Sequence, residues 1–279
     1  MSSIASTAVS IGDRIHSKSS RYSWLQVSRG RAFAGHLCLS ATIVGLVFAV
    51  VFLLWYPQPY FEAVGAWSII RILVGVDLVL GPLLTLIVFK PGKRLLILDV
   101  SVIAVIQISA LLYGLKVLHE ERPYYAVFAI DRIEILARKD IPEFVYVQHD
   151  WMRKPLAGPI LASAKRPESV EAQQRLLEET IFGGAPDIEL RPEFWVPLKQ
   201  DVAELASRAH PLATLRSHDD AKELLDDALA RSGFDEGDLG FLPIASAKNN
   251  ASALLHLETG ELVDVLPVDP WAVLAQAKG

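Results

Sequence analysis

The chain has 279 residues, of which 52% are hydrophobic, and its formal net charge at pH 7 is −5. The charge is unevenly distributed: residues 1–122 contain 11 Lys or Arg and 6 Asp or Glu, whereas residues 123–279 contain 16 and 26. An acidic C-terminal half of this size argues against nucleic-acid binding, which requires a basic surface. The single cysteine, Cys38, excludes an intrachain disulfide and every zinc or haem motif built from several cysteines.

The N-terminal arm, residues 1–32, is rich in Ser, Ala and charged residues and has no apolar periodicity. Such a segment buries too little apolar surface to offset the entropy of ordering, so we expect it to be disordered. Its last part, Arg21–Arg31, contains Trp24, Leu25 and Val27 and is a candidate amphipathic lead-in at the membrane surface.

Three long apolar runs follow, at Phe33–Tyr56, Val64–Phe89 and Leu95–Leu118. Each run reaches the ~20 residues that a helix needs to cross the hydrocarbon core of a bilayer. The first run exceeds the ~7–15 residues of a signal-peptide core and has no clear A-x-A cleavage site after it, so we expect a retained anchor. Residues 33–122 are therefore predicted to form a three-helix transmembrane domain.

Basic residues predict the orientation of these helices. The arm is basic, the loop at residues 57–66 has no Lys or Arg, and the loop at residues 90–94 has three. Because cytoplasmic loops carry the excess of Lys and Arg, the N-terminus is predicted to be cytoplasmic and residues 123–279 periplasmic, if the cell is a Gram-negative bacterium. Aromatic residues near the outer ends of the helices are expected to contact lipid headgroups: Trp55, Tyr56, Tyr60, Trp67 and Tyr113.

The tail, residues 123–279, has no further apolar run and is predicted to fold by itself as an α+β domain with a small antiparallel sheet. Aromatic and β-branched runs predict strands, and the last strands are joined by the turn pairs Asn249-Asn250 and Thr259-Gly260. Ser217 is predicted to cap a helix. The predicted elements, in chain order, are strands at 124–135 and 144–148, helices at 168–182, 201–209 and 217–231, and strands at 241–247, 251–257 and 261–266.

Asp77 lies near the middle of the second apolar run, where an ionisable side chain is costly and requires a partner or a function. Counted from the ends of their runs, Thr42 and Gln107 lie at a similar depth, so the three side chains could form one polar layer. Two main interpretations are open: hydrogen bonds that join the three helices, or docking of a polar group from another protein's membrane helix. A proton pathway is the third, although a single acidic residue does not make a relay.

Arg71 lies about one turn below Trp67 and suits snorkelling to the outer headgroups; it is also a candidate for docking a partner helix. Small residues spaced by four allow close helix packing. Packing within this protein and packing against a foreign helix explain them equally well. They occur in the first run at Ala41, Gly45 and Ala49 and in the third at Ala110 and Gly114.

Signatures of catalysis are missing from the sequence. It has no dinucleotide-binding, P-loop, nucleophile-elbow or zinc-protease motif. The seven histidines are scattered, and neither His149 nor His218 has companions at metal-ligand spacing. Ser163 and Lys165 resemble a Ser/Lys catalytic pair in composition only. We therefore expect no enzymatic activity, no cofactor and no metal.

Several segments together resemble a known family. They are similar, in this order, to segments of the TfpX/TfpZ family of type IV pilin accessory proteins, which are inner-membrane proteins of Gram-negative bacteria. The resemblance is strongest over residues 33–135, and the tail is similar in layout only, including its closing LPVDPW at residues 266–271. The segments are LWYP at residues 54–57, YFEAVGAW at 60–67, GVDLVLGPLLTLIVF at 75–89, PGK at 91–93, RP at 122–123 and VFAIDR at 127–132.

The resemblance implies a non-enzymatic role in the stability, presentation or assembly of a pilin subunit, which would be the partner. It supplies no catalytic residues. Two rival classes are a receptor whose periplasmic domain binds a small ligand and, least favoured, a membrane hydrolase. The predicted cytoplasmic parts, residues 1–32 and 90–94, contain no output domain, which weakens the receptor hypothesis. A hydrolase would need a polar constellation that the sequence does not show.

Overall fold

The computed structural model describes residues 28–58, 60–91, 93–245 and 250–276. The predictions made for the N-terminal arm therefore lie almost entirely outside the described residues. The chain divides into two compact units. Of the described residues, the helical unit contains 28–47 and Ile69–Leu115, and the sheet unit contains those within Phe48–Ser68 and from Lys116 onward.

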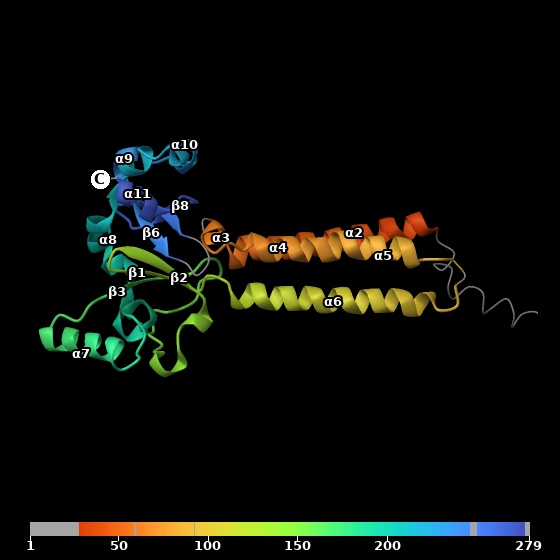
Figure 1. Cartoon of the computed structure of the whole chain (residues 1–279), viewed down its shortest axis with the longest axis horizontal. Helices are drawn as coiled ribbons and strands as arrows, with labels where there is room; N and C mark the ends of the chain where they lie inside the picture. Colours follow the sequence, from red (N-terminus) through yellow and green to blue (C-terminus); the bar gives the residue numbers. More distant parts are fainter. Residues whose placement is uncertain (1–27, 59, 92, 246–249, 277–279) are drawn as a thin grey trace, which may run out of the picture. The chain divides into compact units, whose positions relative to one another are not determined.

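The three predicted membrane runs are confirmed as three long helical segments (Figure 1). With 27, 22 and 25 residues, each is long and apolar enough to cross a membrane, which indicates a multi-pass membrane protein. The first consists of α2 (Arg29–Val50) and the π-helical turn η2 (Val51–Trp55), the second of α4 (Trp67–Val74), the π-helical turn η3 (Gly75–Leu80) and α5 (Gly81–Val88), and the third of α6 (Leu96–Glu120).

The second helical segment contains a proline and is nonetheless continuous. Pro82 has no N–H, and in a regular α-helix its ring would clash with the carbonyl four residues earlier. The wide turn η3 ends at Leu80, two residues before this proline. Local π-helical adjustments of this kind are one way in which membrane helices accommodate proline. The same turn contains Asp77, so the backbone irregularity and the polar residue coincide.

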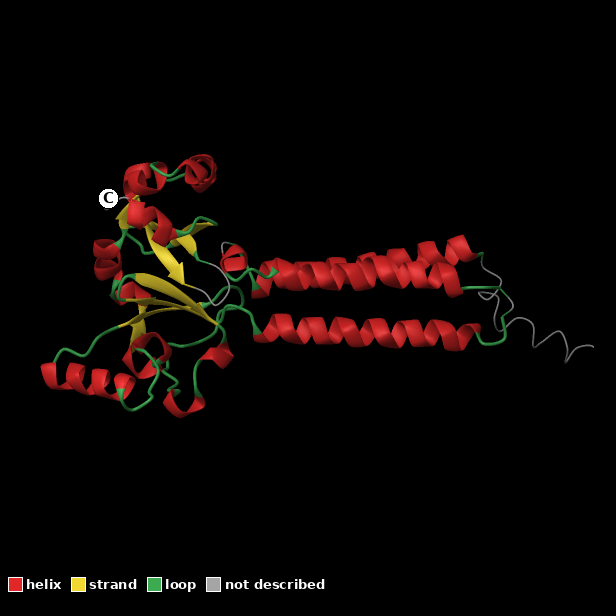
Figure 2. Ribbon diagram, in the orientation of Figure 1, coloured by secondary structure: helices red, strands yellow, loops and turns green. Residues whose placement is uncertain are grey.

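An eight-stranded mixed sheet forms the framework of the sheet unit (Figure 2). The predicted α+β class is confirmed, but the sheet is larger than expected and not wholly antiparallel, because β1 pairs with β3 and β2 with β6 in parallel. The strands lie in the order β4-β3-β1-β2-β6-β7-β8, with β5 also pairing with β6. They are β1 (Tyr125–Ala129), β2 (Arg132–Leu136), β3 (Ile160–Ala164), β4 (Trp195–Pro197), β5 (His210–Pro211), β6 (Leu239–Ala245), β7 (Ala251–His256) and β8 (Leu262–Leu266).

Two of the predicted strands are wrong. The segment 124–135 is the hairpin of β1 and β2, and its turn contains Ile130 with φ 64°. This left-handed conformation is rare for a β-branched residue, and the turn Ile130-Asp131 lacks the glycine of the Asn-Gly or Asp-Gly pairs that usually mark a hairpin. The segment 144–148 begins inside the 3₁₀ turn Glu143–Val145, continues without regular secondary structure and is not a strand. The three C-terminal strands are confirmed as β6, β7 and β8, whereas Asn249 lies outside the described residues.

The helices predicted in the tail are confirmed as α7 (Val170–Ile181), α8 (Val202–Arg208) and α10 (Asp219–Ser232). The predicted cap of α10 is wrong, since His218 holds the N-cap position and Ser217 ends the preceding helix. The shorter elements were not predicted. They are α3 (Tyr60–Ala63), α9 (Leu212–Arg216), α11 (Pro270–Gln276) and 3₁₀ turns at Arg138–Asp140, Ile188–Leu190, Pro192–Phe194, Leu198–Gln200 and Glu236–Asp238.

Strand β1 is buried on both of its faces. Ala126 and Phe128 belong to one apolar cluster, and Tyr125 and Val127 belong to another. Because side chains alternate between the faces of a strand, the two clusters lie on opposite faces of the sheet. The first cluster also contains Tyr60 from the loop between the first two helical segments. A residue far from the tail in sequence therefore completes the core of the sheet unit.

Candidate functional site

Asp77 is buried in the helical unit, with 6% of its surface exposed. Its Oδ2 has no hydrogen-bond partner among the described residues. Its backbone carbonyl accepts a hydrogen bond from Gln107 Nε2 at 3.4 Å. The structure thus brings Asp77 and Gln107 together, as their similar depth predicts, and this hydrogen bond uses the main chain of position 77. Burial places the carboxylate between helices of this protein and away from the exposed surface of the unit.

Gly81 leaves the space that the Gln107 side chain occupies. A Cβ at position 81 would lie 1.9 Å from Gln107 Nε2, which is far inside van der Waals contact. A Cβ at Gly75, six residues earlier, would meet nothing within 4 Å. The absence of a side chain at position 81 is therefore required for the observed position of the glutamine amide.

Thr42 does not join this contact. Its side chain is exposed and donates to the carbonyl of Cys38, in its own helix, at 2.9 Å. The buried polar residue of α2 is Ser40, which lies about 200° away from Thr42 around the helix. The predicted polar layer therefore contains Asp77 and Gln107 but not Thr42. Counting from the ends of the apolar runs gives the depth of a residue but not the side of the helix on which it lies.

A second polar contact joins the first and second helical segments and was not predicted. His36 Nδ1 lies 2.6 Å from Thr85 Oγ1, and Thr85 is buried. Helical spacing is the sequence signal that could have found it. Asp77, Gly81 and Thr85 are spaced by four residues, as are His36 and Ser40, which places each set on one side of its helix.

The remaining candidates differ in their surroundings. Arg71 is exposed on α4, so snorkelling and docking are both still open for this residue. In the third segment, a Cβ at Gly114 would lie 3.2 Å from Leu73 Cδ1, so this glycine packs within the helical unit, and Ala110 is half-buried. The stripe of the first segment is exposed, and a Cβ at its glycine would meet nothing within 4 Å. It consists of Ala41, Gly45 and Ala49.

Several aromatic residues in or near the loop between the first two helical segments pack against one another within the sheet unit. Phe61 is fully buried, with its ring centroid 4.6 Å from that of Phe52 and 5.1 Å from that of Trp67. Tyr56 is also buried, and its hydroxyl donates to the carbonyl of Leu118 at 2.7 Å. The prediction that Tyr56 and Tyr60 contact headgroups is therefore wrong, since both side chains are buried in protein. Trp67 and Tyr113 are exposed and fit that prediction.

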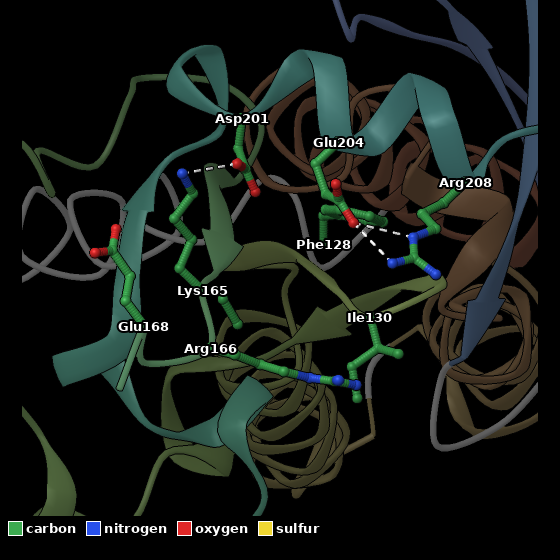
Figure 3. A pocket seen from close by; sticks show the side chains of 9 residues that line it. Phe128, Ile130, Lys165, Arg166, Glu168, Asp201, Glu204 and Arg208 are labelled. Carbon is green, nitrogen blue, oxygen red and sulfur yellow. Dashed lines mark hydrogen bonds and ion pairs between the residues drawn. The ribbon is translucent and has the colours of Figure 1, made fainter. Parts of the chain in front are cut away.

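A polar pocket of about 290 Å³ lies where β1 and β3 end (Figure 3). Lys165 Nζ lies 3.0 Å from Asp201 Oδ1, and Arg208 Nη2 lies 2.9 Å from Glu204 Oε1. The Ser163 hydroxyl donates to the other carboxylate oxygen of Asp201. Ser163 and Lys165 thus share a carboxylate and do not form a nucleophile–base pair. Within the described ranges, no group of three His, Cys, Asp or Glu side chains is placed to hold a metal ion.

Lys154 gives the sheet unit a testable pH dependence. Burial, and then the charge of Arg122, lowers the pKa of Lys154 from 10.5 to about 8. Between these two values the unfolded chain holds a proton that the folded chain has lost, so stability is expected to rise with pH across this window. Lys154→Met is expected to flatten the rise, measured by denaturant unfolding of the detergent-solubilised chain at about pH 7.5 and about pH 9.5. The same rise in both proteins would contradict this assignment.

Comparison with known proteins extends over much of the chain. The family model described as "Fimbrial assembly protein FimB" matches residues 25–65, the first helical segment and the loop that carries Tyr60. No solved structure matches significantly.

Three relatives come from Dichelobacter nodosus. The fimbrial assembly proteins of serogroup I and serogroup E1 are each 31% identical over 220 residues, which is 77% of this chain and 85% of the relative. The fimbrial assembly protein of serogroups C1 and C2 is 41% identical over 108 residues, 38% of this chain and 82% of the relative. With similarity over most of the length of these relatives, the chain belongs to the fimbrial assembly protein family.

Proposed function

We propose that this protein is a non-enzymatic accessory factor in the assembly of type IV fimbriae, also called type IV pili. The observation that carries the proposal is the similarity over 85% of the length of proteins named fimbrial assembly proteins. Within this family we assign the chain to the TfpX/TfpZ type, on the segments between residues 33 and 135. Its partner is then the fimbrial subunit, the pilin.

We place the protein in the inner membrane, with a cytoplasmic N-terminus and the sheet unit in the periplasm. The distribution of basic residues over the arm and the two loops supports this orientation. In this arrangement the three membrane helices and the periplasmic domain would hold a subunit that also has one membrane helix and a periplasmic head. Residues 33–122 act as the membrane domain and residues 123–279 as the main part of the periplasmic domain.

The expected topology can be tested with a reporter that is active only in the periplasm. Fused after Gly279, the reporter is expected to be active, and fused within residues 90–94 it is expected to be silent. Equal amounts of both fusions on a membrane immunoblot serve as the control. The reverse activities would contradict the orientation and the compartment of the sheet unit.

A further inference from the structure

Helix α7 carries apolar residues on two sides. On one side Leu176 packs against the apolar cluster that contains Trp195. On the other side Val170, Leu177 and Ile181 are 63%, 58% and 65% exposed. Their spacing of seven and four residues places these three on one side of the helix, which we call the outer face of α7. A surface helix needs one apolar side to pack on its domain, so the fold does not account for the outer face.

Helix α7 is held on the sheet unit by Leu176 and by one ion pair, and its first turn is capped locally. The Ser169 hydroxyl caps its first turn, accepting from the Ala172 N–H at 3.2 Å. Near its last turn, Glu179 forms a 2.8 Å ion pair with the buried Arg191. Figure 1 shows α7 at the periphery of the sheet unit.

Charges border the outer face on one side only. Glu171 and Glu178 lie there, both exposed, and neither carboxylate has an ion-pair partner among the described residues. The opposite border is formed by Gln173 and Thr180, which are neutral. A partner that fits the outer face of α7 therefore needs an apolar surface with Lys or Arg along one edge.

Charge disfavours two other occupants, an antiparallel second copy of α7 and a lipid surface. In an antiparallel pair of α7 helices related by a twofold axis, the border with Glu171 and Glu178 would face the same border of the second copy, which is repulsive. A lipid surface is disfavoured because residues 123–279 contain 16 basic and 26 acidic residues, and anionic headgroups repel such a domain. A protein partner with a basic edge remains.

We propose that the outer face of α7 binds the fimbrial subunit, through an apolar surface of the subunit that is bordered by Lys or Arg. This inference rests on the proposed function, which supplies the identity of the partner. Burial of exposed Leu and Ile side chains is the main source of affinity, and the two carboxylates select the basic edge.

The test is site-specific photo-crosslinking in cells, with the crosslinker at Gln174, an exposed position on the outer face. The full chain is expected to give a crosslink to the fimbrial subunit. Leu177→Ala with Ile181→Ala is expected to reduce it about tenfold, since alanine preserves the helix while removing the apolar area. Glu171→Lys with Glu178→Lys is expected to reduce it as well. Leu156→Ala is the matched control, because Leu156 is 84% exposed and lies outside α7.

Crosslinks to a second copy or to lipid alone, or unchanged crosslinking in the double alanine variant, would overturn the inference. Counting surface fimbriae distinguishes a failure of this inference from a failure of the proposed function. If deletion of the gene leaves fimbriae unchanged, the proposed function itself fails. If deletion abolishes fimbriae and the double alanine variant restores them fully, the inference about α7 fails and the proposed function stands.

Discussion

Tyr60→Ala is expected to lower the free energy of unfolding of the sheet unit by about 3–5 kcal/mol, the usual range for removing a large buried aromatic ring. Tyr60 is 8% exposed and belongs to the same apolar cluster as Phe128, Leu242 and Leu255. Since this residue comes from the loop between two membrane helices, its loss would leave a cavity in the core of the sheet unit. The measurement is denaturant unfolding of the detergent-solubilised chain, followed by tryptophan fluorescence.

Phe144→Ala is the matched control for this substitution. Phe144 is an aromatic residue of the same unit that is 77% exposed, so its removal is expected to change stability by less than about 0.5 kcal/mol. A fragment that starts at Pro123 lacks Tyr60 altogether and is expected to be less stable than the same domain in the full chain. Equal unfolding midpoints for Tyr60→Ala and Phe144→Ala would show that the loop does not contribute to the core.

Gly81→Ala is expected to destabilise the helical unit by about 1–2 kcal/mol, the upper part of the range for polar contacts between membrane helices. The new Cβ would lie 1.9 Å from Gln107 Nε2. The glutamine must then turn away and lose its hydrogen bond to the carbonyl of Asp77. Thermal unfolding in detergent, followed by circular dichroism, measures the loss.

Gly75→Ala is the control, because a Cβ at Gly75 meets nothing within 4 Å on the same helical segment. Asp77→Asn is the companion variant and is expected to be nearly silent in stability, since Gln107 donates to the backbone carbonyl of position 77. If Asp77→Asn accumulates normally but does not support fimbriae, Asp77 docks a partner. Normal fimbriae in this variant and in Arg71→Gln would leave these residues with only structural or snorkelling roles.

Local patterns in the sequence were sufficient for the elements that each depend on one stretch of chain. Three apolar runs of membrane length need no distant partner to be recognised, because every backbone polar group of a spanning helix is bonded within that helix. The helices α7, α8 and α10 were predicted from local helix start and stop signals, and the strands β6, β7 and β8 from short apolar runs separated by turn pairs. Asp77 also stood out by itself, since a carboxylate in an apolar run is costly.

The tertiary structure alone decided which distant segments meet. The parallel pairings of β1 with β3 and of β2 with β6 depend on long connections that carry no local signal, so the sheet was expected to be smaller and antiparallel. Rotation around each helix decided that Ser40 and not Thr42 is buried. The packing of Tyr60 into the sheet unit follows from neither composition nor spacing, because an aromatic residue near a membrane helix suits the lipid interface and a protein core equally well.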